Sequence, residues 1–493
     1  MKRRGLLLAV FLLLVAQVFA GNLRLGSPFT EHMVLQRDQP IQVWGEAVPG
    51  SSVSVKLGNY IATAPTNSVG EWKATLPKQK AGGPFSFSVI SGDESLAFTD
   101  VMIGDVWICS GQSNMQMGFK GIPEVAELEA KAKNIRTFKF KRTVAFEEQK
   151  YIDGQWVDEV PESAVAFSFA YFLEAEADVP VGIILTCWGS SSIEGWMPRD
   201  MTEKLPHFKK IMAEFDADEV KKAKIDSILA VEQRSTPGDI LLRTQPNIIY
   251  NAMMKPFAPY ACRGIVWYQG EANAKNIDDM LQYGETLPLW IERMRNEWNQ
   301  PDLHFLGVML PGYGNQLQPL ELTDSLMESP EALSWAWMRE SQCKALELPN
   351  TAIATTIDLG DKTNIHPKDK LPVGQRLALL AGKSTLGYKG LSDGPLLKKV
   401  SIKRNSIVIA YENAKGLKTT DGDLPKAFWM AGVSGKWVRA TATIKGEKVV
   451  LTSSELTAPT YVRYAFSAMP NVNLVNAAGL PARPFRTDKF KAE

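Results

Sequence analysis

The pattern of hydrophobic and polar positions changes twice along this chain. From residue 22 to about residue 100, apolar and polar residues alternate in short runs that are separated by Pro, Gly and Asn turns. This period of two is typical of antiparallel strands with one buried face. We therefore predict an N-terminal β domain over residues 21–100, a β sandwich or a similar small fold. The clearest runs are IQVWG (41–45), VSVKL (53–57) and FSFSVI (85–90).

Residues 101–392 contain continuous apolar runs, with helical spacing between them at 162–177 and 283–298. Strands that are buried on both faces and joined by helices form parallel sheets, so we predict an α/β domain. The charged stretch at about 203–240 is predicted to be a helical insertion over that sheet. The apolar runs are VMIGDVWIC (101–109), VGIILTCW (181–188), GIVWYQ (264–269), LHFLGVML (303–310) and TAIATTIDLG (351–360).

Alternation returns after residue 392, for example in VSIKRNSIVIAY (400–411), KVVLTS (448–453) and TYVRYAF (460–466). These runs predict a second β domain over residues 393–493. The expected fold class is therefore α/β, with a sandwich-like β region on each side of the central domain.

The first 20 residues are typical of a secretory signal peptide. MKRR is a basic start, GLLLAVFLLLVAQVFA is an apolar stretch, and Val18-Phe19-Ala20 suits cleavage after Ala20. We expect export to the periplasm or the cell exterior. No later apolar run is long enough to span a bilayer, so no integral membrane span is expected after processing.

Composition narrows the classes of partner. The chain has 493 residues, is 45% hydrophobic and 22% charged, and carries a formal net charge of +1, so nothing favours binding to nucleic acid. Its four cysteines, Cys109, Cys187, Cys262 and Cys343, form no C-x-x-C pair or Cys/His cluster. No zinc site is therefore expected, and the serine chemistry considered below needs no metal or organic cofactor. Buried free thiols are predicted, with a disulfide after export as the alternative.

Candidate chemistry is concentrated where the middle apolar runs end. The segments SGQSN, GSSSIEGW, GEANA and DKTNIHP follow four of these runs directly. Ligands of an open parallel sheet bind beyond the carboxyl ends of its strands, so we expect the four segments to converge. Acyl transfer needs a nucleophile, a base and donors for the oxyanion, and these segments contain all three.

Ser113 is the candidate nucleophile, because Gly111 permits a tight turn before it; Ser110 is the rival, and an ordinary polar turn is the alternative for the whole stretch. His366 is the candidate base, since it alone of four histidines follows a middle strand, and an ordinary imidazole pKa near 6.5 suits proton exchange with serine. A structural turn histidine is the alternative. The other three histidines are His32, His207 and His304.

Several groups could complete the site. Asp361 or Asp358 could orient the histidine. Gly189 could offer a backbone N–H to the oxyanion, and Gln269 and Asn273 could offer side-chain amides, although turn formation explains each of these equally well. The G-x-S-x-G motif is absent, because Met115 stands where its second glycine would be, and this disfavours an ordinary α/β-hydrolase.

Five motifs together resemble the sialate O-acetylesterase family, and the resemblance covers most of the chain. They are GDVWICSGQSNMQM, VGIILTCWGSSSIEGWMP, GIVWYQGEANA, NIHPKDKLPVGQRLAL and AAGLPARPFRTD. The family belongs to the SGNH group of serine esterases. The resemblance implies a flavodoxin-like, three-layer α/β/α hydrolase domain. It also implies Ser113 as nucleophile, Gly189 in the oxyanion hole with the Ser113 N–H, His366 as base, and Gln269 or Asn273 as amide donor, with Gln269 preferred.

The sequence departs from the wider group at one position. Many relatives have Asp three residues before the histidine, where this chain has Thr363. The third member of the triad is therefore open between Asp361 and a Ser–His dyad that a backbone carbonyl orients.

The expected reaction is hydrolysis of an O-acetylated sugar through an acyl-enzyme, and the sugar is either a sialic acid or a unit of a plant polysaccharide such as xylan. Trp188 and Trp196 are predicted to stack on the sugar, with core packing as the alternative. Gln112 and Glu271 are predicted substrate contacts, with a scaffold role as the alternative for Glu271. No basic residue stands out for a sialic acid carboxylate; Arg199 is merely near. Two other classes are a glycosidase that uses Glu194 and Glu271 and a non-catalytic glycan-binding protein.

Overall fold

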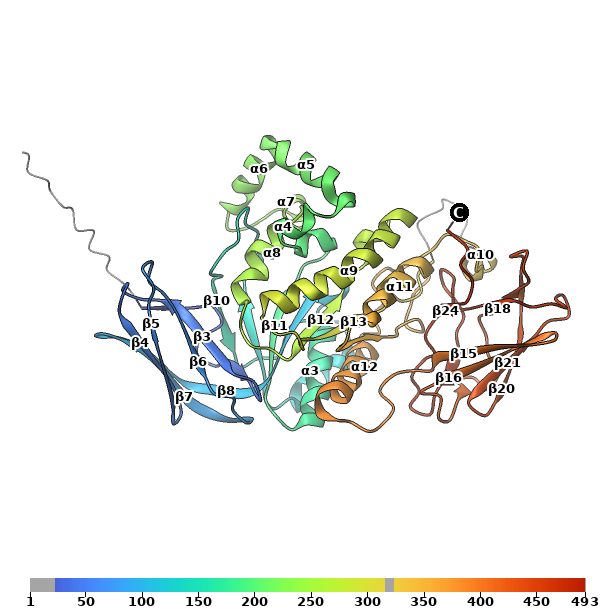
Figure 1. The fold of residues 1–493 in the computed structure, drawn as a ribbon, viewed down its shortest axis with the longest axis horizontal. Coiled ribbons are helices and arrows are strands. Elements are labelled where there is room, and N and C mark those ends of the chain that lie inside the picture. Colours follow the sequence, from blue (N-terminus) through green and yellow to red (C-terminus); the bar gives the residue numbers. More distant parts are fainter. Residues whose placement is uncertain (1–22, 315–322, 493) are drawn as a thin grey trace, which may run out of the picture.

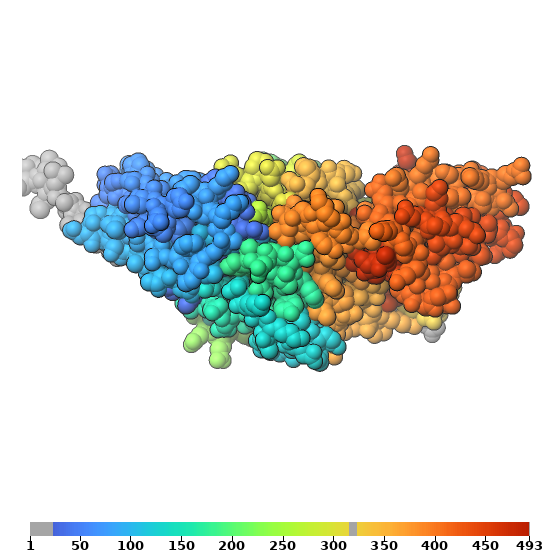
Figure 2. Space-filling model, turned by 90° about the horizontal axis from the view of Figure 1, so that it is seen from below, coloured from blue at the N-terminus to red at the C-terminus, as the bar shows by residue number. Residues whose placement is uncertain are grey.

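The computed structural model describes residues 23–314 and 323–492. The predicted signal peptide, residues 1–20, lies outside the described residues. Three regions follow one another along the long axis of the molecule: a β region, a central α/β region and a second β region (Figures 1 and 2). The predicted α/β class, with extra β-sheet regions on both sides, is confirmed in this form.

The N-terminal region is built from short strands with one buried face. In β3 (Ile41–Glu46), Ile41 and Val43 are buried, whereas Gln42 and Trp44 on the other face are partly exposed. This strand pairs with two others in a three-stranded sheet, and a second group of strands pairs with the start of β8. The remaining strands are β1 (Arg24–Leu25), β2 (Val34–Gln36), β4 (Ser52–Leu57), β5 (Tyr60–Pro65), β6 (Glu71–Leu76) and β7 (Gly82–Ser91).

Strand β8 (Glu94–Gly111) joins the first region to the second. Its first residues alternate between partly buried and exposed positions and pair with β7, whereas nearly all residues from Val101 onward are buried. The predicted domain boundary at residue 100 therefore falls inside one continuous strand. The alternating pattern before residue 100 and the continuous apolar run after it therefore belong to one strand.

The central sheet has the order β10-β9-β11-β8-β12-β13-β14. All neighbours are parallel except β10, which is antiparallel to β9 at the edge, so the sheet is mixed. The chain places β11 on one side of β8 and β12 on the other, which makes the carboxyl end of β8 a topological switch point. The strands are β9 (Ile135–Phe140), β10 (Gly154–Val157), β11 (Val181–Cys187), β12 (Gly264–Tyr268), β13 (His304–Val308) and β14 (Thr351–Ala354).

Helices cover the central strands on both sides. Helices α3 (Ala164–Ala177) and α12 (Leu371–Ala381) lie on one side, and α9 (Ile277–Glu297) and α11 (Ala336–Cys343) lie on the other (Figure 1). Helices α3 and α9 begin with capped turns, because Ser163 and Asn276 each accept a hydrogen bond from a backbone N–H group one turn later. The two helices predicted at 162–177 and 283–298 are therefore present.

The predicted insertion is helical and sits above the sheet in Figure 1. It contains charged, short helices that bury one face each, such as Met212 and Phe215 of α5. The remaining short α-helices of the described chain are α1 (Ser113–Gln116), α2 (Pro123–Ala126), α4 (Arg199–Thr202), α5 (Lys209–Ala217), α6 (Glu219–Leu229), α7 (Thr236–Arg243), α8 (Ile248–Met253) and α10 (Asp324–Glu328).

The C-terminal region has a hydrophobic core of its own. Two four-stranded sheets contribute alternate residues to it, among them Ile407, Ile409, Val449 and Val462, while the first two regions share a single core cluster. The strands are β15 (Leu396–Lys403), β16 (Ser406–Glu412), β17 (Lys418–Thr419), β18 (Phe428–Ala431), β19 (Trp437–Arg439), β20 (Thr441–Lys445), β21 (Lys448–Thr452), β22 (Tyr461–Tyr464), β23 (Leu474–Val475) and β24 (Phe485–Arg486).

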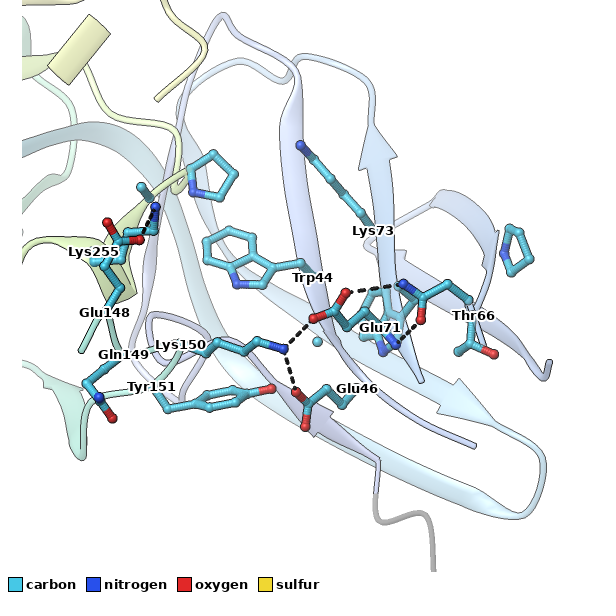
Figure 3. Close-up of a pocket in the computed structure, with 16 residues that line it drawn as sticks. Trp44, Glu46, Thr66, Glu71, Lys73, Glu148, Gln149, Lys150, Tyr151 and Lys255 are labelled. Atoms are coloured by element: carbon cyan, nitrogen blue, oxygen red, sulfur yellow. Dashed lines mark hydrogen bonds and ion pairs between the residues drawn. The ribbon is translucent and has the colours of Figure 1, made fainter. Parts of the chain in front are cut away.

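A cavity of about 710 Å³ lies where the N-terminal region meets the central one. Its walls are the outer face of β3 and β6 and the segment 148–151. Figure 3 shows Lys150 reaching across it to the carboxylates of Glu46 and Glu71, beside the rings of Trp44 and Tyr151. None of the predicted catalytic residues lines this cavity.

Three further expectations concern thiols, membranes and metals. The four cysteines are unpaired, and all but Cys343 are fully buried. Within residues 23–314 and 323–492, no helix has both the length and the apolar character needed to cross a membrane. The same residues contain no group of three His, Cys, Asp or Glu side chains that could hold a metal ion.

Candidate active site

The candidate nucleophile Ser113 lies at the carboxyl end of β8, in the loop of residues 110–117, which we call the nucleophile loop. Gly111 has φ +134°, and a side chain there would place its Cβ 2.1 Å from the carbonyl oxygen of Tyr268 in β12. Only glycine tolerates both conditions. The rival Ser110 is fully buried and donates to the carbonyl of Thr186 at 2.7 Å, so it is a structural residue of the sheet.

The candidate base His366 lies in the segment of residues 361–370, which we call the histidine loop. Its Nε2 is 2.7 Å from Ser113 Oγ, although 253 positions separate the two residues in the chain. Burial lowers the pKa of His366, and the positive charge of Lys370 lowers it further. The imidazole is therefore kept neutral near pH 7, which is the form that accepts a proton from serine.

The carboxylate of Asp361 does not meet the histidine ring. It accepts hydrogen bonds from the backbone N–H groups of Thr363 (2.8 Å) and Asn364 (2.7 Å), and so closes a turn of its own loop. Asp358 pairs instead with Arg376 at 2.6 Å. In the part of the chain that the structure describes, nothing hydrogen-bonds Nδ1 of His366. The structure therefore brings Ser113 and His366 together, and it does not bring the Asp361 carboxylate to the His366 ring.

A buried hydrogen-bond network connects the nucleophile loop to the histidine loop. Asn114 Nδ2 donates to the carbonyl of Ile365 at 3.0 Å and to Glu271 Oε1 at 2.5 Å, while its Oδ1 accepts from Lys370 Nζ at 2.6 Å. Burial raises the pKa of Glu271 and lowers that of Lys370 to about 8. Because the carbonyl of Ile365 directly precedes His366, this network fixes the base relative to the nucleophile.

Gly189 places its backbone N–H beside the nucleophile. A Cβ added to Gly189 would lie 3.3 Å from Ser113 Cβ. The Gly189 N–H donates to Oε1 of Gln116 at 2.6 Å, so a side-chain carbonyl oxygen occupies the position that an oxyanion would take. The role of Gly189 as an oxyanion donor stays a prediction.

The two amides proposed as further oxyanion donors lie behind the wall of the site. Gln269 is fully buried, and its Nε2 donates to Asn273 Oδ1 at 2.8 Å and to Gln112 Oε1 at 3.2 Å. Asn273 Nδ2 donates to Glu194 Oε2 at 3.1 Å. Neither amide lines the cavity that contains Ser113. Both amides are therefore hydrogen-bonded within the wall of the site, and their part in an oxyanion hole stays a prediction.

A cavity of about 850 Å³ opens over Ser113 and His366. It is lined by side chains from all four predicted segments and from the insertion, including Gln112, Glu271, Glu194, Arg243 and Lys275. Gln112 and Glu271 reach the cavity wall, although each is more than nine-tenths buried, and their role as substrate contacts stays a prediction.

The prediction that two tryptophans stack on the sugar is wrong. Trp188 and Trp196 are 1% and 0% exposed. Their indole N–H groups donate to Asp239 (3.2 Å) and Ser191 (2.8 Å), and neither ring lines the cavity. Both pack in the core. Arg199, noted for its position in the sequence, is bound to Asp216 at 2.9 Å and lies outside the cavity lining.

Sequence reasoning missed four residues of the site: Asn114, Gln116, Lys370 and Arg243. The first three stand within four positions of Ser113 or His366, so proximity was an available signal. Nothing in the sequence around Arg243 pointed to the site, because it follows a charged helical insertion.

Comparison with known proteins identifies the family. The family model described as carbohydrate esterase, sialic acid-specific acetylesterase matches residues 103–231 and 242–381. The chain belongs to this carbohydrate esterase family. The match contains both loops of the dyad and Gly189, and omits the end of the insertion. The predicted resemblance to sialate O-acetylesterases is therefore confirmed.

Individual members of this esterase family resemble the chain over nearly its full length. It is 27% identical to the sialate O-acetylesterase of Mus musculus, with 94% of each chain covered, and 26% identical to that of Homo sapiens, with 98% and 96% covered. A solved structure of a carbohydrate acetylesterase from Xanthomonas citri is 31% identical, with a TM-score of 0.80, and covers 95% of this chain and 100% of that one.

Proposed function

We propose that this esterase removes acetyl groups from O-acetylated sugars through an acyl-enzyme on Ser113, with His366 as general base and acid. The observation that carries the proposal is the 2.7 Å contact between Ser113 Oγ and His366 Nε2 inside an open cavity. That distance lies within the range in which a base takes the proton of a nucleophile.

The reaction proceeds in two halves. Ser113 Oγ attacks the acetyl carbon while its proton moves to His366 Nε2, and the carbonyl oxygen becomes an oxyanion beside the N–H of Gly189. Gln116 Oε1 must leave that N–H for this to happen. His366 then protonates the sugar alkoxide, which departs. Water attacks the acetyl-enzyme with His366 as base, and acetate and free Ser113 result.

Because no carboxylate contacts the imidazole in this dyad, the histidine loop itself must orient the ring. Asn364 Oδ1 accepts a hydrogen bond from the backbone N–H of His366 at 2.9 Å, and Asn114 Nδ2 donates one to the carbonyl of Ile365. These contacts fix the main chain on both sides of the ring. Asp361 supports them indirectly, since it closes the turn that presents Asn364.

The proposal also includes the layer arrangement of the central domain and the cellular location of the protein. We infer a flavodoxin-like three-layer SGNH domain, supported by parallel strands with helices on both sides. We also infer export to the periplasm or cell exterior, supported by the basic and apolar start of residues 1–20. The relatives named for sialate esters support a sialic acid substrate, whereas the Xanthomonas citri enzyme is named only for carbohydrate esters.

Acetate release from two substrates tests the proposal. Residues 21–493 are incubated with O-acetylated sialic acid and with acetylated xylo-oligosaccharide, beside the Ser113→Ala and Ser110→Ala variants. We expect release from at least one substrate, its loss in Ser113→Ala, and its survival in Ser110→Ala as far as that variant folds. Release that persists in Ser113→Ala would exclude this nucleophile and return attention to the carboxylates Glu194 and Glu271.

A further inference from the structure

The cavity between the N-terminal and central regions contains a tryptophan, Trp44 of β3, whose ring is fixed by its neighbours. The rings of Phe29 and Tyr260 contact it edge-on, with centroids 4.8 Å and 6.4 Å away. Gly26 leaves room for the indole, because a Cβ there would lie 2.5 Å from Trp44 Nε1. Trp44 is nevertheless only partly buried, and its N–H has no hydrogen-bond partner in the described chain. A rigid aromatic surface therefore lines the cavity.

Charged side chains stand beside this indole on the outer face of the sheet. In the register of β3 and β6, Trp44 lies opposite Lys73, and Glu46 lies opposite Glu71. Lys150, from the central region, forms ion pairs with both glutamates across the cavity (Figure 3). The side chains of Glu46, Glu71 and Lys150 are 37%, 43% and 64% exposed. Ion pairs as exposed as these contribute little, so a ligand can join or replace them, and each carboxylate has lone pairs for further donors.

The charged side chains that line this cavity balance one another. Three carboxylates and three ammonium groups contribute to its walls, namely Glu46, Glu71, Glu148, Lys73, Lys150 and Lys255. Lys255 pairs with Glu148 at 2.8 Å and with Glu297, outside the cavity lining, at 3.1 Å. A charged ligand would therefore find no excess of opposite charge. A neutral ligand rich in hydroxyl groups can donate to the carboxylates and accept from the ammonium groups.

We propose that this cavity is a second, non-catalytic site, which binds a neutral sugar unit of a glycan. A pyranose ring has a C–H face that packs on an aromatic ring and a rim of hydroxyl groups that hydrogen-bond to charged side chains, and the cavity offers both surfaces. Trp44 packs against the ring, and Glu46, Glu71 and Lys73 bind its hydroxyl groups.

The size and position of the cavity agree with this role. Its volume of about 710 Å³ is within the range of small-molecule sites, roughly 300–1,000 Å³. Among the described residues, none lines both this cavity and the one over Ser113. Sugar binding at this site is therefore independent of the esterase function proposed above.

Isothermal titration calorimetry with neutral oligosaccharides tests the proposal. Residues 21–493 are titrated with xylohexaose, cellohexaose and mannohexaose, which carry neither charge nor acetyl groups and so are not substrates of the proposed esterase. We expect at least one of them to bind with a Kd of roughly 0.1–1 mM, since one stacked ring and a few hydrogen bonds only slightly exceed the entropy lost on association.

Variants of the cavity wall locate the binding. Trp44→Ala should raise the Kd by about 10-fold or more, and Trp44→Phe should restore part of the affinity. Glu71→Gln keeps the shape of the side chain but removes its charge, and should raise the Kd by roughly 3- to 10-fold. Because Glu71 is an exposed side chain, this variant keeps the test valid even if Trp44→Ala fails to fold.

A tryptophan elsewhere on the protein provides the matched control. Trp429 of β18 is also partly buried, and its ring contacts the guanidinium of Arg439 at 4.7 Å in the C-terminal region. Trp429→Ala should leave the Kd unchanged, and thermal unfolding verifies that each variant is folded. The proposal would be overturned if none of the three sugars bound the wild type, if binding were unchanged in Trp44→Ala and Glu71→Gln, or if Trp429→Ala weakened it equally.

Discussion

Asn114 connects more of the active site than any predicted residue, and its removal gives a quantitative test. The substitution Asn114→Ala deletes a side chain that is completely buried and makes three hydrogen bonds. It leaves the Lys370 ammonium without its amide acceptor, and Glu271 and the carbonyl of Ile365 without their donor.

The expected loss of stability follows from these partners. A buried polar group that loses its hydrogen-bond partner costs about 1–3 kcal/mol, and more if it is charged. With one charged and two polar groups affected, and some relaxation, we expect a total of about 3–5 kcal/mol. This is a large part of the ~5–15 kcal/mol that stabilises a typical protein. Catalysis should suffer as well, because a shift of His366 by about 1 Å can lower kcat by about 100-fold.

Urea unfolding and acetate release measure the two effects separately. Asn251→Ala is the matched control: Asn251 is also buried, and its Nδ2 donates to the carbonyls of Ala145 (3.0 Å) and Phe146 (2.9 Å), away from the dyad. The control should lose stability but keep its kcat. If Asn114→Ala were as stable as the wild type, or if both variants lost the same fraction of kcat, the reasoning about this network would be refuted.

Three further predictions concern pH and packing. Lys370→Gln removes a charge that lowers the pKa of His366, so the acid limb of the kcat/KM profile should move to higher pH; an unmoved limb would contradict this assignment. For Asp105, burial alone would raise the pKa, but Arg37 and Arg263 outweigh it, so its folded pKa is below the ordinary one. The stabilisation that the Asp105 carboxylate provides is present above pH ~4, and it is lost as the pH falls through the pKa of Asp105 in the folded protein. In thermal unfolding, the free energy of unfolding of Asp105→Asn should therefore be lower than that of the wild type by about 3–5 kcal/mol at pH 7. This difference should become smaller toward pH 2. Trp196→Ala should cost about 3–5 kcal/mol in urea unfolding, because it empties a core position; a raised KM at unchanged stability would restore a sugar-stacking role.

The sequence predicted those parts of the fold that a repeating pattern encodes. The buried runs and strand ends located Ser113, Gly189 and His366, because the carboxyl ends of parallel strands must meet. It missed β9, since IRTFKF mixes charged and apolar residues although its first four positions are buried. The long side chain of Arg136, for example, reaches the Asp100 carboxylate at 2.8 Å, and the pattern cannot show this.

Side-chain direction was the other limit. Trp188 and Trp196 stand beside the Gly189 loop in the sequence, but their rings point into the core, and only packing decides between the two directions. Asp361 is close to His366 in the sequence, yet the backbone of its own turn offers nearer donors. Arg243 was beyond reach, since its place in the site depends on how a helical insertion folds back over the sheet.

The continuity of β8 has a practical consequence for any attempt to divide this protein. The strand that ends at the nucleophile loop begins in the N-terminal sheet, and the two regions share one hydrophobic core, whereas the C-terminal region has a core of its own. A fragment that starts at residue 103, where the family match begins, would cut this strand in half. Calorimetry should accordingly resolve two melting units rather than three, and limited proteolysis should release the C-terminal sheets while the first region stays attached to the catalytic serine.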